Sequence, residues 1–136
     1  MLTHAVVMID IRRKIREQIA LSDRTTLEIG ALDKPIADSS ILSNSGKIFY
    51  LDHLSTDELQ SKYANDSAID IKKIVPVDFV CSGDDFLQAV GGKKFGTIVA
   101  SHVFEHVPNP LKWVRDVLSV LEDDGVLHLI IPDKRF

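Results

Sequence analysis

The segment FGTIVA at residues 95–100 decides the fold, because it predicts a strand that is buried on both faces. Its last three residues show no alternation of apolar and polar side chains, a pattern typical of a central strand in a parallel sheet. Residues 126–131 form a second nearly all-apolar run. A helix is predicted between the two runs, and Asn109 and Pro110 mark its beginning as a cap and a first-turn proline.

The same alternation of strand and helix extends toward the N-terminus. Strands are predicted at residues 26–29, 47–51 and 73–77, and Pro76 marks the last of these as an edge strand or a bulge. Helices are predicted at residues 4–20, 56–64 and 84–90, and residues 123–125 are predicted to form a turn. Short apolar strands separated by helices indicate an open α/β sandwich with a mainly parallel sheet.

Composition restricts the class of protein. The chain has 136 residues, 45% hydrophobic and 26% charged, which predicts one globular domain rather than a disordered chain or a rod. Residues 1–24 form the helix and lead-in, and residues 25–136 form the core. A net charge of −4 gives no basic footprint for nucleic acid or membrane, and no apolar run is long enough for a membrane span. The lone cysteine, Cys81, predicts no internal disulfide and a cytoplasmic location.

Ligands of such sheets bind beyond the carboxyl ends of the strands. The loops of interest therefore start at Gly30, Asp52, Asp78, Ser101 and Pro132. Gly30 allows a tight turn and a close backbone approach to a ligand. Asp52 follows Glu28 by 24 positions, a spacing at which a carboxylate accepts the ribose hydroxyls of a nucleotide. Asp78 is a candidate acceptor for an exocyclic amine.

Taken in order, five segments resemble class I S-adenosylmethionine-dependent methyltransferases. They are LEIG at 27–30, YLDHL at 50–54, VDFV at 77–80, ASHVFEHVP at 100–108 and LEDDGVL at 121–127. The resemblance implies a three-layer Rossmann-like sheet with strand order 3-2-1-4-5, extended in the family by a final antiparallel strand pair. We expect that pair to be missing here, which would leave a C-terminally incomplete core with an exposed fifth-strand edge.

The resemblance also implies a set of site residues. Glu28, Gly30 and Ala31 would lie beside the methionine part of S-adenosylmethionine, and Asp52 and His53 beside the ribose. Asp78 would meet the adenine amine, with Phe79 beside the ring, and Ser101 and His102 would flank the cofactor near its methyl group. His102 is the candidate catalytic base, and no metal is expected. The product would be S-adenosylhomocysteine, and the acceptor a small molecule or glycan rather than nucleic acid.

Three alternatives remain at this point. A non-catalytic, degenerate methyltransferase fold that serves in binding or dimerisation is favoured by Leu32, which stands where a second loop glycine would be. Residues 102–106 match the zinc-protease pattern H-x-x-E-H, which needs both histidines on one helix. A nicotinamide-dependent oxidoreductase would share the first half of the fold but lacks the full glycine fingerprint. The exposed fifth-strand edge further predicts self-association.

Overall fold

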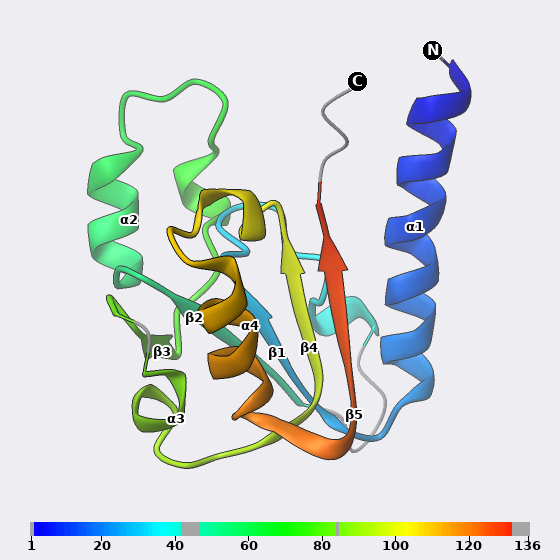
Figure 1. Cartoon of the computed structure of the whole chain (residues 1–136). Helices are drawn as coiled ribbons and strands as arrows, with labels where there is room; N and C mark the ends of the chain where they lie inside the picture. Colours follow the sequence, from blue (N-terminus) through cyan, green and yellow to red (C-terminus); the bar gives the residue numbers. More distant parts are fainter. Residues whose placement is uncertain (1, 42–46, 84, 132–136) are drawn as a thin grey trace.

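The structure is a computed structural model, and it describes residues 2–41, 47–83 and 85–131. The elements are α1 (Leu2–Leu21), β1 (Thr25–Ile29), η1 (Ser39–Ile41), β2 (Lys47–Asp52), α2 (Thr56–Lys62), η2 (Ile71–Lys73), β3 (Phe79–Val80), α3 (Phe86–Ala89), β4 (Phe95–Ser101), η3 (Phe104–His106), α4 (Pro110–Leu118) and β5 (Leu121–Ile130). All strand pairs are parallel, and the order is β3-β2-β1-β4-β5 (Figure 1), which confirms the predicted α/β fold class.

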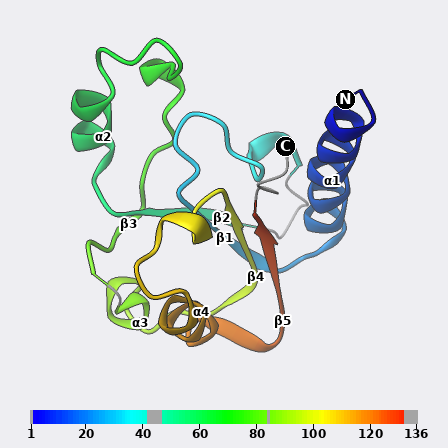
Figure 2. The same cartoon turned by 45° about the horizontal axis from the view of Figure 1, so that its top comes forward.

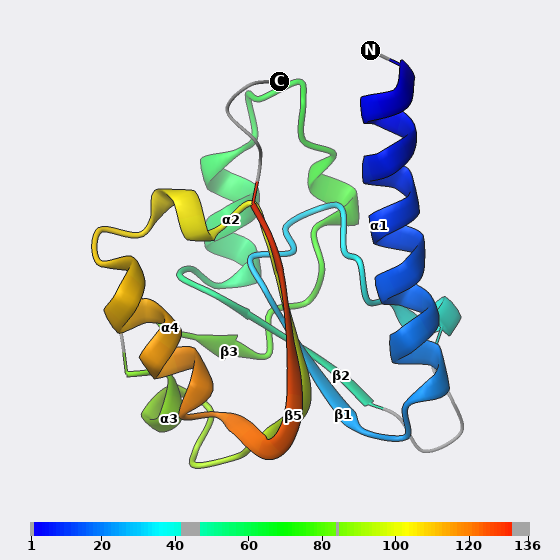
Figure 3. The same ribbon diagram turned by 45° about the vertical axis from the view of Figure 1, so that its right-hand side comes forward.

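Helices cover both faces of the sheet. On one face, Ile15 and Ile19 of α1 pack with Val99 of β4. On the other face, Val117 of α4 packs in one cluster with Ile98, and α3 lies beside α4 (Figure 3). The alternation of neighbouring β4 side chains between the two clusters explains why this segment is apolar without interruption. None of the helices in the described part of the chain is long and apolar enough to cross a membrane.

The third strand lies later in the chain than the sequence pattern predicts. The prediction of a strand at 73–77 is wrong, because β3 follows that segment. Pro76 has no N–H to donate to a ladder, and the N–H of Val75 donates to the carbonyl of Leu32 at 2.9 Å. Val75 is therefore buried over the loop after β1 rather than in the sheet. As a result, the loop beyond β3 starts at Cys81.

The start of β5 also differs from the prediction. The predicted turn at 123–125 lies within the strand, where the register of β5 against β4 shifts. Gly125 suits this irregularity, since a Cβ there would lie 2.6 Å from Leu121 Cδ1. In the sheet of the described residues, β5 is an edge strand, as predicted. The predicted loop at Pro132 and the first residue of the predicted helix at 84–90 lie outside the described residues.

Candidate functional site

A cavity of about 850 Å³ opens at the carboxyl ends of the strands. It is lined by residues at the ends of four of them, namely Gly30 after β1, Asp52 at the end of β2, Cys81 after β3 and His102 after β4. Figure 2, in which this end of the molecule comes forward, shows the loop after β1 and the turn η3 after β4 at the same edge of the sheet. Apolar side chains of the wall include Leu51, Leu59, Phe86, Val107 and Trp113. The position agrees with the prediction for an open parallel sheet.

Backbone geometry makes glycine necessary at the first of these loops. Gly30 has a φ of +68°, and its N–H donates to the carbonyl of Leu51 at 2.9 Å. A Cβ at Gly30 would lie 2.8 Å from Val103 Cγ2, so a side chain would collide with the loop after β4. The loops after β1 and β4 are therefore packed against each other at the cavity.

Two other residues lining the cavity have a left-handed backbone although they carry side chains. Leu32 has a φ of +54° and His102 a φ of +58°. For residues with a Cβ this conformation costs about 1–2 kcal/mol, and such residues cluster at functional sites. Leu32 stands where a second loop glycine would be, and its backbone conformation is one that favours glycine. The His102 N–H donates to the Ile130 carbonyl at 2.9 Å, which holds the loop after β4 against β5.

Asp52 presents a free carboxylate oxygen at the cavity. Its side chain is 10% exposed, and its Oδ1 accepts the backbone N–H of His53 at 2.7 Å and lies 2.6 Å from the His53 ring Nδ1. Among the described residues, nothing donates to Oδ2. A buried carboxylate with one free oxygen is an acceptor prepared for a ligand hydroxyl. The structure thus brings four of the predicted site residues, Gly30, Asp52, His53 and His102, to one cavity.

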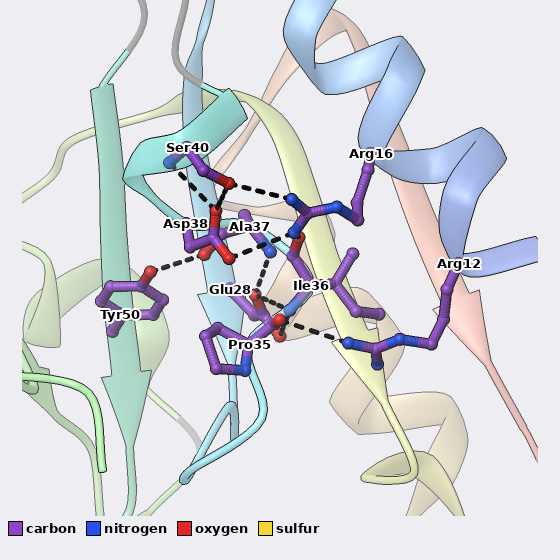
Figure 4. A network of polar contacts seen from close by, with 9 residues as sticks. All are labelled: Arg12, Arg16, Glu28, Pro35, Ile36, Ala37, Asp38, Ser40 and Tyr50. Atoms are coloured by element: carbon purple, nitrogen blue, oxygen red, sulfur yellow. Dashed lines mark hydrogen bonds and ion pairs between the residues drawn. The ribbon is translucent and has the colours of Figure 1, made fainter. Parts of the chain in front are cut away.

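Glu28 lies outside the cavity, on the opposite face of β1. Its carboxylate accepts the backbone N–H groups of Ile36 and Ala37 at 2.8–3.0 Å (Figure 4). Burial raises the pKa of Glu28 to about 7, and the two backbone hydrogen bonds lower it in part. Ala31 is also buried outside the cavity. These two residues support the loop after β1 and do not line the cavity.

The predicted adenine residues Asp78 and Phe79 are also outside the cavity. Asp78 accepts the Tyr50 N–H at 2.9 Å and donates its own N–H to the Tyr50 carbonyl at 2.9 Å. The Phe79 ring packs in the core, 5.7 Å from the ring of Phe49 between centroids. Ser101 is half-buried at the end of β4 and does not line the cavity.

Three residues that were not predicted from the sequence line the cavity beyond β3, whereas the predicted Asp78 and Phe79 do not. Cys81, Ser82 and Gly83 line the cavity, because the strand ends at Val80 and not before Asp78. Pro76 was the available signal, since a proline argues against continuing the strand through it.

The zinc alternative does not fit the local structure. His106 belongs to η3, which is only three residues long, whereas His102 precedes it with a left-handed backbone. The two histidines are therefore not one turn apart on a helix, as that motif requires. His102 Nδ1 lies 3.7 Å from Glu105 Oε2, and the His102 ring is exposed at the cavity.

Comparison with family models gives a match over residues 5–136, to a family described as a methyltransferase domain. The chain belongs to this family. The methyltransferase domain has the strand order β3-β2-β1-β4-β5 that the resemblance implies, and the match covers the whole of the sheet. Among curated proteins, none matches the chain significantly.

Solved structures resemble the methyltransferase domain in fold. An arsenic(III) S-adenosylmethionine methyltransferase from Chlamydomonas reinhardtii matches with a TM-score of 0.56 and 16% identity, over 81% of this chain and 39% of that one. A SAM-dependent methyltransferase from Aquifex aeolicus matches with a TM-score of 0.56 and 16% identity, over 87% of this chain and 62% of that one. The methyltransferase domain thus spans less than two thirds of either structure.

Proposed function

We propose that this methyltransferase domain binds S-adenosylmethionine in the cavity and transfers its methyl group to an acceptor. The observation that carries the proposal is the Oδ2 of Asp52, to which no described residue donates, on a side chain that is 10% exposed and lines the cavity with Gly30. In this arrangement the Asp52 carboxylate accepts the ribose hydroxyls, while Gly30 allows the backbone to approach the methionine part.

Size and chemistry of the cavity support this ligand. A volume of about 850 Å³ lies within the range of small-molecule and cofactor sites, and its walls combine apolar side chains with a few polar groups. Phe86 and Trp113, whose rings lie 6.3 Å apart in an edge-to-face arrangement, offer an apolar surface for the adenine next to Cys81 and Ser82. We therefore propose that the adenine binds beside these residues and not beside Asp78 and Phe79.

The remaining predicted residues receive indirect roles in this proposal. Glu28 and Ala31 hold the loop that meets the methionine part, and Asp78, Phe79 and Ser101 support the strand ends. His53 supports Asp52, which meets the ribose.

The sulfonium of S-adenosylmethionine supplies an activated methyl group, so the main task of the domain is to position two reactants. The His102 ring, exposed at the cavity, accepts a proton where the acceptor needs a base.

The acceptor we propose is a small molecule or a glycan. A net charge of −4 offers no general electrostatic attraction for nucleic acid. We also propose a cytoplasmic location, in keeping with the single thiol of Cys81, and self-association through the β5 edge.

Calorimetric titration tests the proposal, with S-adenosylhomocysteine as the ligand and NAD as the control. We expect micromolar binding of S-adenosylhomocysteine alone. Asp52→Ala should weaken it by about 1–3 kcal/mol, the cost of a lost hydrogen bond to a charged group. Asp123→Ala removes an exposed carboxylate at the opposite end of the sheet and should leave the affinity unchanged. A folded wild-type protein that binds no S-adenosylhomocysteine would overturn the proposal.

A further inference from the structure

Three polar side chains form a hydrogen-bonded chain that runs from the surface to the cavity. The Lys62 Nζ of α2 lies 3.4 Å from the Nε2 of His53, and the His53 Nδ1 lies 2.6 Å from the Oδ1 of Asp52. Burial increases along the chain, because Lys62 is exposed, the His53 side chain is 52% exposed and the Asp52 side chain only 10%. The chain therefore ends on the carboxylate that faces the cavity.

The chemistry of the three groups determines where the ring proton lies. A lysine ammonium has three donors and no acceptor, so the His53 Nε2 must accept in its contact with Lys62. In the neutral ring the proton is then on Nδ1. An ionised carboxylate is acceptor-only, so this Nδ1–H donates to Asp52 Oδ1, which lies 2.6 Å away.

This arrangement occupies one oxygen of Asp52 and leaves the other free. Oδ1 accepts two donors from the same residue, the ring Nδ1–H and the backbone N–H of His53. Two donors converging on one oxygen restrict rotation of the carboxyl group. Oδ2, to which nothing in the described part of the chain donates, is thereby held in one orientation on a residue that lines the cavity.

We infer that His53 is a positioning residue for Asp52, with its own tautomer selected by Lys62, and that together they orient Oδ2 toward the vicinal hydroxyls of a ribose. The inference rests on the proposed function, since it assigns a nucleoside to this end of the cavity. It differs from a direct contact between His53 and the ligand, because His53 acts here only through the carboxylate.

Two substitutions of His53 distinguish the roles of its two ring nitrogens. The amide nitrogen of asparagine lies as many bonds from Cα as the histidine Nδ1, and that of glutamine as many as Nε2. His53→Asn should therefore retain the donor to Asp52 and bind S-adenosylhomocysteine within about threefold of wild type. His53→Gln and His53→Ala lose that donor and should weaken binding by about tenfold. Equal losses in the asparagine and glutamine variants would overturn the inference.

A double-mutant cycle tests whether His53 acts through Asp52. In an Asp52→Ala background, His53→Ala should cause no further loss of S-adenosylhomocysteine affinity, because the group that it orients is absent. Additive losses would overturn the inference and indicate a direct contact with the ligand. Thermal unfolding of each variant confirms that the fold is retained.

Nitrogen-15 NMR of the ligand-free protein gives a readout that needs no ligand. The His53 ring should show the Nδ1–H tautomer, and Lys62→Met should shift the ring toward the mixture of an unrestrained histidine. A wild-type ring protonated on Nε2 would overturn the inference. If the wild-type protein binds no S-adenosylhomocysteine, the proposed function fails, whereas wild-type binding that is unchanged in His53→Ala overturns only the role of His53.

Discussion

The carboxylate of Glu28 accepts the backbone N–H of Ile36 with both oxygens, at 2.9 and 3.0 Å, on the face of β1 that is turned away from the cavity. Arg16 of α1 donates to the carbonyl of the same Ile36 at 2.8 Å, and Arg12 donates to the carbonyl of Pro35 at 3.2 Å (Figure 4). Residues 35–37 of the β1–β2 connection are thus held by side chains of β1 and α1, on the face of the sheet away from the cavity. The near end of this connection, starting at Gly30, lines the cavity.

Replacement of Glu28 should change how stability depends on pH. In the unfolded chain Glu28 ionises near its ordinary pKa of 4.5, whereas burial raises its pKa to about 7 in the folded protein. Between these pH values the unfolded state releases a proton that the folded state keeps, so the free energy of unfolding falls by roughly 3 kcal/mol as the pH rises. Glu28→Gln, which cannot ionise, should lack this fall.

Urea unfolding from about pH 4.5 to 8 gives the free energy of unfolding against pH for the wild type and for Glu28→Gln, and the difference between these two curves isolates Glu28. All other titrating groups are common to both proteins and cancel in it. Parallel curves would contradict the prediction.

A methyl group at Gly30 should destabilise the domain more than one at Gly91. Both glycines have a left-handed backbone, with φ values of +68° and +66°. A Cβ at Gly30 meets Val103 Cγ2 at 2.8 Å, but one at Gly91 meets nothing within 4 Å. Gly91→Ala should therefore cost about 1 kcal/mol from backbone strain alone, and Gly30→Ala about 1–3 kcal/mol more from overpacking.

Chemical denaturation gives the free energy of unfolding of both glycine variants. Val103→Ala in the Gly30→Ala background should recover part of the stability that Gly30→Ala loses. Equal costs at the two glycines would show that the contact with Val103 has no energetic role.

Arg16 should not be replaceable by lysine. Its guanidinium donates at once to the Ile36 carbonyl, to the carboxylate of Asp38 at 3.2 Å and to the hydroxyl of Ser40 at 3.0 Å. A lysine ammonium lacks this planar fork, so Arg16→Lys should reduce the free energy of unfolding by about 1–2 kcal/mol. Arg13→Lys is the matched control on the same helix, because its ion pair with Glu17 spans 4.0 Å between exposed side chains.

The measurement is thermal or urea unfolding of the two arginine variants side by side. A loss at Arg13 as large as that at Arg16 would argue against a specific role of the fork.

Charge at the β5 edge should suppress self-association. Val126 is 48% exposed on β5, which no described strand flanks on its outer side, so that its outer backbone groups can pair with another copy. Light scattering at high protein concentration should show association of the wild type that Val126→Lys weakens. Leu111→Lys places the same charge on an exposed apolar residue of α4 and should leave association unchanged. A strictly monomeric wild type at high concentration would refute this prediction.

Much of the fold follows from local signals in the sequence. The uninterrupted apolar run in β4 predicts a central parallel strand, and the cap at Asn109 with Pro110 predicts the start of α4, which begins there. Gly30 and Asp52 are predicted at strand ends and line the cavity together. These features depend on near neighbours along the chain, on strand patterning and on the common edge of a parallel sheet, so the sequence is sufficient for them.

Other features depended on which distant segments pack together. The position of β3 was decided by the packing of Val75 over the loop after β1, which moved the start of the loop beyond the strand from Asp78 to Cys81. The direction of Glu28, away from the cavity, was decided by the pleat of β1 and by the backbone N–H groups of Ile36 and Ala37.

The sequence by itself thus determined the layers and the edge at which the site forms, because these follow from apolar periodicity and right-handed connections. The strand order was implied by the resemblance to the methyltransferases. Only the tertiary structure decided which polar groups face the cavity, since a carboxylate is held by whatever donors surround it. Two aspartates at predicted strand ends illustrate this. Asp78 accepts the N–H of Tyr50 through Oδ2 and does not line the cavity, whereas Asp52 lines it.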